Sequence, residues 1–95
     1  MELKQMQKVS FYIGSNNTTK QKEPEKAFLV LNSFFSDYTI LNTIGAWQGL
    51  QEESFIIEVI TDKTEEELLS IRDQLKTALA QESVLLTCET IKGSF

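Results

Sequence analysis

The spacing of the apolar residues changes several times along this chain, and these changes limit the folds that it can adopt. Apolar side chains at every second position, as in Val9, Phe11 and Ile13, are typical of a strand with one buried face. Apolar side chains at every third or fourth position are typical of a helix with one buried face. The spacing predicts strand, helix, strand, strand, helix and strand over residues 9–13, 24–35, 38–47, 55–60, 64–81 and 84–91.

Local signals support these assignments. Pro24 suits the first turn of a helix, where its missing N–H has no hydrogen bond to lose. Thr64 and Glu67 have the spacing of a capping box, in which each side chain bonds the backbone N–H of the other residue. Residues 48–51 are typical of a turn, so the strands on either side should form an antiparallel hairpin. Gly45 within the first of these strands indicates a bulge or a close backbone approach.

The order β-α-β-β-α-β is that of the ferredoxin-like fold, an α+β architecture with a four-stranded antiparallel sheet and two helices on one face. Right-handed crossovers place the first and third strands at the centre of the sheet. We expect one domain over residues 9–95, preceded by a loose polar lead-in over residues 1–8. The side chains expected to face the helices are Val9, Phe11, Ile13, Phe55, Ile57, Val59, Val84 and Leu86.

Composition excludes several classes of function. The 95 residues include no histidine and one cysteine, Cys88, which excludes a Ser-His triad, an internal disulfide and a zinc site of clustered cysteines. The net charge of −5 argues against binding to duplex nucleic acid. No apolar run approaches the ~20 residues of a membrane span, and the N-terminus lacks the apolar core of a signal peptide. We therefore expect a cytoplasmic protein with no cofactor, no metal and no membrane partner.

The face of the sheet away from the helices should expose more apolar surface than a monomer usually does. Burying such a patch against a second copy could supply several kcal/mol, at ~25 cal/mol per Å². We therefore expect a homo-oligomer, and ligand sites in oligomers commonly lie in grooves between subunits. The alternative is that the N-terminal segment, with Leu3 and Met6, folds over the patch. The interface residues predicted on this face are Tyr12, Ile56, Ile60 and Leu85.

A polar segment over residues 14–20 joins the first strand to the first helix. Gly14 permits a turn, the Asn and Thr side chains offer hydrogen bonds, and Lys20 offers positive charge, which are the ingredients of an anion or phosphate cradle. The segment is not a Walker sequence, and an ordinary polar loop would have the same composition. Tyr12 or Trp47 could stack on a base, although Trp47 could equally pack in the core or the oligomer seam. The predicted ligand-binding residues are Tyr12, Gly14, Ser15, Asn16, Asn17, Thr18, Lys20 and Trp47.

We predict no catalytic residue. Glu58 lies on the expected central strand, and if it were buried beside Glu89 the two carboxyl groups could form an acid/base pair. We favour the alternative, in which Glu58 lies on the outer face and pairs with a lysine or arginine. Cys88 has no histidine to activate it, so it is expected to be a small buried apolar side chain.

Three short stretches carry a resemblance to a known group of proteins. They are Ile13-Gly14-Ser15-Asn16-Asn17, the segment from Tyr38-Thr39-Ile40 to Gly45-Ala46-Trp47-Gln48-Gly49, and Gln81-Glu82-Ser83-Val84-Leu85. With these the chain resembles small uncharacterised proteins of Gram-positive bacteria and their phages over about residues 9–91. That resemblance implies a ferredoxin-like fold and supplies no activity. In size and style the chain is also similar to compact phage proteins that multimerise and sequester nucleotide immune signals in the host cytoplasm.

These observations lead to one expected function and two alternatives. We expect a non-enzymatic homo-oligomer that binds a small anionic ligand, such as a nucleotide, between its subunits. In a phage it would act as an anti-defence sponge that sequesters a nucleotide immune signal. The first alternative is a protein-binding module that inhibits a host defence enzyme through its acidic helix face or a strand edge. The second is a metal-independent enzyme that cleaves a nucleotide with Lys20 and a glutamate.

Overall fold

The computed structural model describes residues 2–15 and 21–95, and within them the chain forms two helices and four strands. Their order is β-α-β-β-α-β, as predicted. The elements are β1 (Lys4–Ile13), α1 (Pro24–Leu31), β2 (Thr39–Trp47), β3 (Leu50–Ile60), α2 (Glu65–Ala78) and β4 (Leu85–Gly93).

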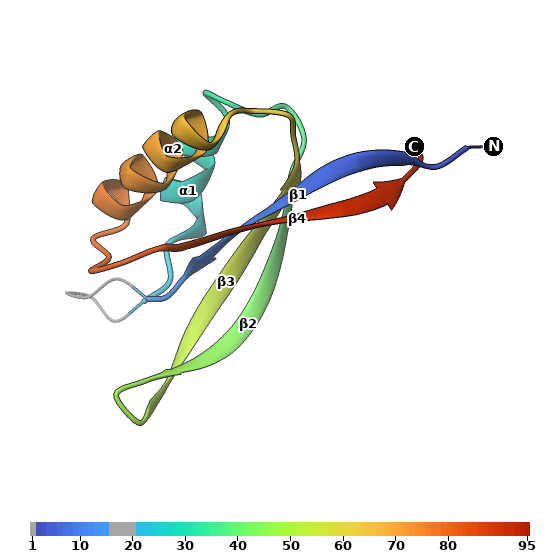
Figure 1. Cartoon of the computed structure of the whole chain (residues 1–95). Helices are drawn as coiled ribbons and strands as arrows, with labels where there is room; N and C mark the ends of the chain where they lie inside the picture. The colour runs from blue at the N-terminus through green and yellow to red at the C-terminus, as the bar shows by residue number, and fades with distance from the viewer. Residues whose placement is uncertain (1, 16–20) are drawn as a thin grey trace.

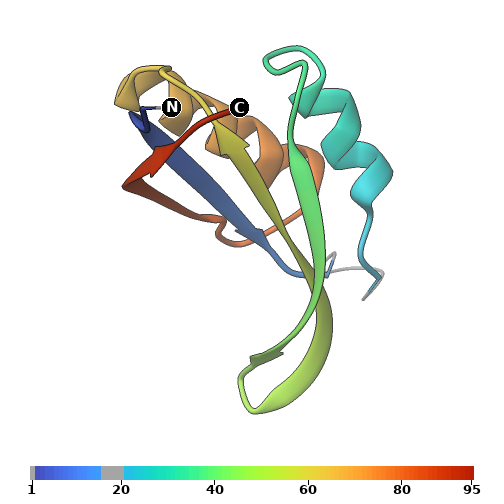
Figure 2. The ribbon, with the colours of Figure 1, turned by 90° about the vertical axis from the view of Figure 1, so that its right-hand side faces the viewer.

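The four strands form one antiparallel sheet in the order β2-β3-β1-β4, so β1 and β3 are central. Both helices lie on the same face of this sheet, and in the described part of the chain no helix covers the opposite face (Figures 1 and 2). This is the ferredoxin-like arrangement, and the predicted fold class is confirmed.

The hydrophobic core lies between the helices and the covered face of the sheet. Register aligns the buried positions of the central strands, since Phe11 lies opposite Ile57 and Ile13 lies opposite Phe55. These four side chains are at most 2% exposed. The predicted helix-facing residues are all buried except Leu86, which is partly buried against the core. From the helices, the core receives Ala27, Leu31, Leu68, Ile71 and Leu75.

The start of α2 has the predicted capping box. The Thr64 hydroxyl accepts a hydrogen bond from the Glu67 N–H at 3.2 Å, and the Thr64 N–H donates to the Glu67 carboxylate at 3.2 Å. These bonds hold the pKa of Glu67 below its ordinary value, chiefly through the backbone N–H of Thr64. The box satisfies two of the donors that a helix start leaves free, so it fixes where α2 begins.

Two strands are longer than predicted because each continues alongside a partner. β1 begins at Lys4 rather than Val9, since Lys4 still pairs with Gly93 of β4. β3 begins at Leu50 because the hairpin turn needs only Gln48 and Gly49, which have positive φ angles of 51° and 79°. Two central residues with positive φ define a tight hairpin turn, which brings Leu50 opposite Trp47. Gly45 pairs in register with Glu52, so it makes no bulge.

α1 is shorter than predicted and ends at Leu31. Beyond it, the Ser33 N–H bonds the carbonyl three residues back, and the Phe34 N–H bonds Leu31 in the same way, which tightens the chain into a turn. Phe34 and Phe35 still pack against the core, so the apolar spacing that suggested a longer helix reflects burial in this turn.

The molecule is elongated, with extents of 47 × 25 × 20 Å. The β2–β3 hairpin projects beyond the helices at one end, and the paired ends of β1 and β4 project at the other (Figure 1). Among the described residues, no helix has the length and apolar character to cross a membrane.

Candidate functional site

The uncovered face of the sheet carries a row of apolar side chains that crosses all four strands. Register places Leu41 opposite Ile56, Ile56 opposite Tyr12, and Tyr12 opposite Leu85. Leu41 is 42% exposed, Tyr12 39% and Leu85 59%. We call these four residues the apolar row.

A charged group lies on the same face, nearer the projecting ends of β1 and β4. The Lys8 ammonium lies 3.0 Å from the Glu58 carboxylate and 3.3 Å from that of Glu89. The two glutamates raise the pKa of Lys8, first through the hydrogen bond that Lys8 donates to the Glu58 carboxylate. Glu58 is therefore on the outer face and paired with a lysine, as favoured from the sequence. Ile60 lies opposite Lys8, and a row with Glu58 and Ser10 separates it from the apolar row.

A cleft of about 490 Å³ opens at the end of β1, between the β2–β3 hairpin and the connection from α2 to β4. We refer to this space as the cleft. Three members of the apolar row, Tyr12, Ile56 and Leu85, also line it. The polar part of its lining consists of Ser15, Thr43, Glu52, Ser54, Gln81, Glu82 and Ser83.

Gln81 fixes the chain where it leaves β1. Its Oε1 accepts a hydrogen bond from the Gly14 N–H at 3.3 Å, and its Nε2 donates to the Ser15 carbonyl at 2.6 Å. The Ser15 hydroxyl in turn donates to the Glu53 carbonyl on β3 at 2.7 Å. Because these bonds reach both β3 and the α2–β4 connection, they hold the two walls of the cleft together.

Glu52 supplies a carboxylate to the cleft. It lies on β3 opposite Gly45, and a Cβ atom added to Gly14 would be 2.6 Å from its Oε1. No hydrogen bond or ion pair joins this carboxylate to another of the described residues. Nearby, the Thr43 and Ser54 hydroxyls share a hydrogen bond of 2.7 Å. The described lining thus offers hydroxyl groups, an amide and two carboxylates, Glu52 and Glu82.

The structure brings three of the predicted ligand-binding residues together at the cleft: Tyr12, Gly14 and Ser15. The predicted residues Asn16, Asn17, Thr18 and Lys20 lie outside the described residues. The backbone of Trp47 ends β2, but the predicted stacking role of its side chain also falls outside the described part of the structure.

Glu52 and Gln81 were not predicted from the sequence. Glu52 follows a turn-like stretch and Gln81 follows the end of a helix, so each had a simple local explanation. The signal that could have found both is Gly14, since a Cβ atom there would lie 2.6 Å from the Glu52 Oε1 and 3.4 Å from the Gln81 Oε1.

A second, larger groove of about 1070 Å³ lies between the start of α2 and the projecting ends of β1 and β4. Cys88 lines it and is exposed, contrary to the expectation of burial. Cys88 lies on β4, an edge strand whose C-terminal part projects beyond the helices (Figure 1). In the described part of the chain, no group of three His, Cys, Asp or Glu side chains is placed to hold a metal ion.

No protein-family model matches the sequence, and no curated protein matches it. Solved structures of ferredoxin-like topology match over nearly the whole chain. One is CPII, a nitrogen regulatory PII-like protein from Thiomonas intermedia K12, bound to ADP, AMP and bicarbonate. It is 16% identical with a TM-score of 0.63, over 99% of this chain and 98% of that chain.

The second kind of neighbour is a phage SAM lyase. In the apo state it is 14% identical with a TM-score of 0.71, over 96% of this chain and 90% of that chain. In complex with S-methyl-5′-thioadenosine, the lyase is 13% identical with a TM-score of 0.66, over 95% of this chain and 90% of that chain. Identities of this size show that the fold is shared, and the chemistry of this chain has to be argued from its own residues.

Proposed function

We propose that this chain is a homo-oligomeric binding protein that holds a small nucleotide-type ligand in the cleft, between two copies of itself. The observation that carries the proposal is the overlap of two surfaces. Tyr12, Ile56 and Leu85 belong both to the exposed apolar row and to the lining of the cleft. A second copy seated on the row would therefore border the cleft and complete its wall.

The apolar row supports the oligomer. Four large apolar side chains in line across a sheet form a continuous stripe, whereas the apolar residues that monomers expose are usually scattered. Lys8, Glu58 and Glu89 lie beside this stripe, and their ion pairs partly neutralise their charges. Interfaces are commonly built in this way, with an apolar centre and a polar rim. The interface residues of the proposal are Tyr12, Ile56, Ile60 and Leu85, joined by Leu41.

The size of the cleft and the neighbouring structures support a nucleotide-type ligand. Pockets for small molecules usually have about 300–1,000 Å³, and the cleft falls within this range. ADP, AMP and S-methyl-5′-thioadenosine, the compounds bound to the two kinds of neighbour, all contain adenosine. In the proposal, Asn16, Asn17, Thr18 and Lys20, which follow Ser15 in the sequence, contact the anionic part, and Tyr12 or Trp47 stacks on the base.

The test is to measure binding and oligomeric state in the same preparation. The protein is mixed with AMP, ADP, ADP-ribose, cyclic dinucleotides, S-adenosylmethionine and S-methyl-5′-thioadenosine, and its melting temperature is followed. A ligand at 100 times its Kd adds ~2.7 kcal/mol of stability, which such a measurement detects. We expect a shift with at least one compound, loss of that shift in Lys20→Ala, and sedimentation as an oligomer.

The fate of the ligand separates binding from chemistry. Heating the complex and analysing the released compound by chromatography should return it intact, as a sponge requires. A cleaved product would instead favour the nucleotide-cleaving enzyme, for which the Glu52 carboxylate in the cleft is the candidate proton acceptor. A flat melting temperature with every compound would contradict the proposal and favour the module that inhibits a host defence protein.

Sequestration in a phage-infected cell is the biological role that we propose for this binding. It requires affinity and sufficient protein, and no step of bond cleavage. If the chain acts in this way, its expression should lower the free concentration of the bound nucleotide in the host and leave the total unchanged.

A further inference from the structure

We infer that the cleft recognises the ribose of its ligand through the Glu52 carboxylate, so that the ligand is a ribonucleoside compound whose negative charge lies outside the cleft. The inference rests on the proposed function, because it specifies which part of a nucleotide-type ligand enters this space.

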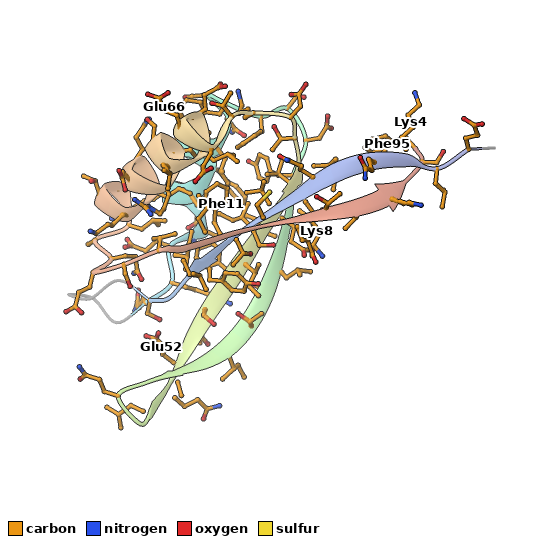
Figure 3. All side chains as sticks on the ribbon, viewed as in Figure 1. Lys4, Lys8, Phe11, Glu52, Glu66 and Phe95 are labelled. Carbon is orange, nitrogen blue, oxygen red and sulfur yellow. The ribbon has the colours of Figure 1, made fainter. Side chains whose placement is uncertain are left out.

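The Glu52 carboxylate has room in the cleft because Gly14 has no side chain. Gly45 is its cross-strand partner on β2, and Gly14 follows the end of β1. A side chain at Gly14 would collide with the carboxylate, since its Cβ would lie 2.6 Å from Oε1 and 3.3 Å from Cδ. Figure 3 shows the Glu52 side chain pointing from β3 toward the end of β1. The carboxylate therefore stands in the cleft beside Gly14, a residue without a side chain.

The charge of the described lining disfavours a phosphate near Glu52. The charged side chains of the described lining are Glu52 and Glu82, and no lysine or arginine is among them. An ionised carboxylate only accepts hydrogen bonds, and so does a phosphate, so the two would repel without a donor between them. The part of the ligand that meets Glu52 must therefore donate hydrogen bonds and carry no negative charge.

A ribose meets this requirement. Its neighbouring 2′ and 3′ hydroxyl groups present two donors, and an acidic side chain that bonds the ribose hydroxyl recurs in dinucleotide-binding folds. The remaining lining suits the rest of a nucleoside. The apolar side chains of Tyr12, Ile56 and Leu85 offer a wall for a base, and the Thr43–Ser54 hydroxyl pair offers further polar contacts.

The experiment compares Glu52→Gln with Glu53→Gln. Glu53 is the next residue of the same strand, so its side chain points to the other face and does not line the cleft. Both variants remove one negative charge, and only Glu52→Gln changes the proposed contact. Binding is measured by calorimetry with adenosine, guanosine, cytidine and uridine, with the 2′-deoxy and 3′-deoxy forms of the best of these, and with its 5′-monophosphate.

We expect the wild type to bind the ribonucleoside at least tenfold more tightly than its deoxy forms, the ordinary size of a hydrogen bond to a charged group. Glu52→Gln should lose most of this preference, and Glu53→Gln should keep it. Equal affinity of the wild type for ribo and deoxy compounds, or tighter binding of the monophosphate by Glu52→Gln, would overturn the inference and leave the proposed function standing. If the wild type binds no nucleoside and no nucleotide, the proposed function fails as well.

Discussion

Gln81 donates a hydrogen bond from its side-chain amide to the carbonyl oxygen of Ser15 at 2.6 Å, although 66 positions of sequence separate the two residues. The bond ties the connection between α2 and β4 to the point where the chain leaves β1. The same side chain accepts from the Gly14 N–H. One glutamine therefore sets the distance between two walls of the cleft.

Replacing this glutamine should cost stability. Gln81→Ala removes two hydrogen bonds to partly buried backbone groups, so we expect the free energy of unfolding to fall by roughly 1–3 kcal/mol. Urea denaturation followed by circular dichroism measures this change. Gln74→Ala is the matched control, since among the described residues Gln74 bonds only the exposed Ser70 hydroxyl and should change stability by less than ~0.5 kcal/mol. Equal losses in the two variants would mean that Gln81 has no special role in closing the cleft.

A methyl group at Gly14 should displace Glu52 without unfolding the protein. The nearest atoms are the end of a long side chain that can rotate away, and Gly14 does not have the positive φ that would strain an alanine. We therefore expect Gly14→Ala to lower the unfolding free energy by no more than about 1 kcal/mol while weakening ribonucleoside binding. Gly45→Ala is the control, because its Cβ would meet Ser54 at an ordinary 3.5 Å. The prediction is wrong if Gly14→Ala binds as the wild type does.

The fold could be predicted because its signals are local. The alternation of Val9, Phe11 and Ile13 and the capping box of Thr64 and Glu67 each lie within a few residues, and each identifies an element correctly. The ends of the elements were less accurate because partners determine them. β1 starts at Lys4 because its partner strand β4 continues to Gly93. No property of residues 4–8 alone predicts this pairing.

The site could be predicted only where it touches such a local signal. Gly14 and Ser15 lie at the change from an alternating strand to a polar segment, and Tyr12 lies on the outer face of the strand. All three line the cleft, and their binding role stays a prediction. Glu52 and Gln81 reach the cleft through contacts between distant parts of the chain. Their role depends on which residues lie opposite them in the fold, and the sequence alone does not give the strand register that decides this.

Breaking the apolar row should separate the proposed oligomer. Leu85→Arg places a charge at the end of the row, where the side chain is 59% exposed, and burying this charge against a second copy would be costly. We expect the variant to sediment at the single-chain mass of 10.8 kDa while its circular dichroism spectrum stays unchanged. Leu29→Arg is the control: Leu29 is 76% exposed on α1, away from the sheet's open face, and should leave the oligomer intact. A wild type that sediments as a single chain at millimolar concentration would contradict the proposed interface.

The capping box of α2 should make stability depend on pH in a defined direction. Because hydrogen bonds from Thr64 lower the pKa of Glu67 in the folded chain, the ionised Glu67 stabilises the fold above the ordinary glutamate pKa of about 4.3. That contribution is lost as the pH falls through the lowered pKa and Glu67 becomes protonated. The wild type should therefore melt at a higher temperature than Glu67→Gln at pH ~7, and the difference should shrink as the solution is acidified below pH ~4.

Glu66→Gln is the matched variant for this last measurement, because it removes the same charge from the same turn of α2 and leaves the capping box of Thr64 and Glu67 in place. Both glutamates face the positive end of the helix, so that general attraction changes in either variant. Only Glu67 has the additional hydrogen bonds to Thr64, and the melting temperature of Glu67→Gln should differ more from the wild type at neutral pH. The same pH profile for both variants would mean that the attraction of the helix end, and not the capping box, stabilises the first turn.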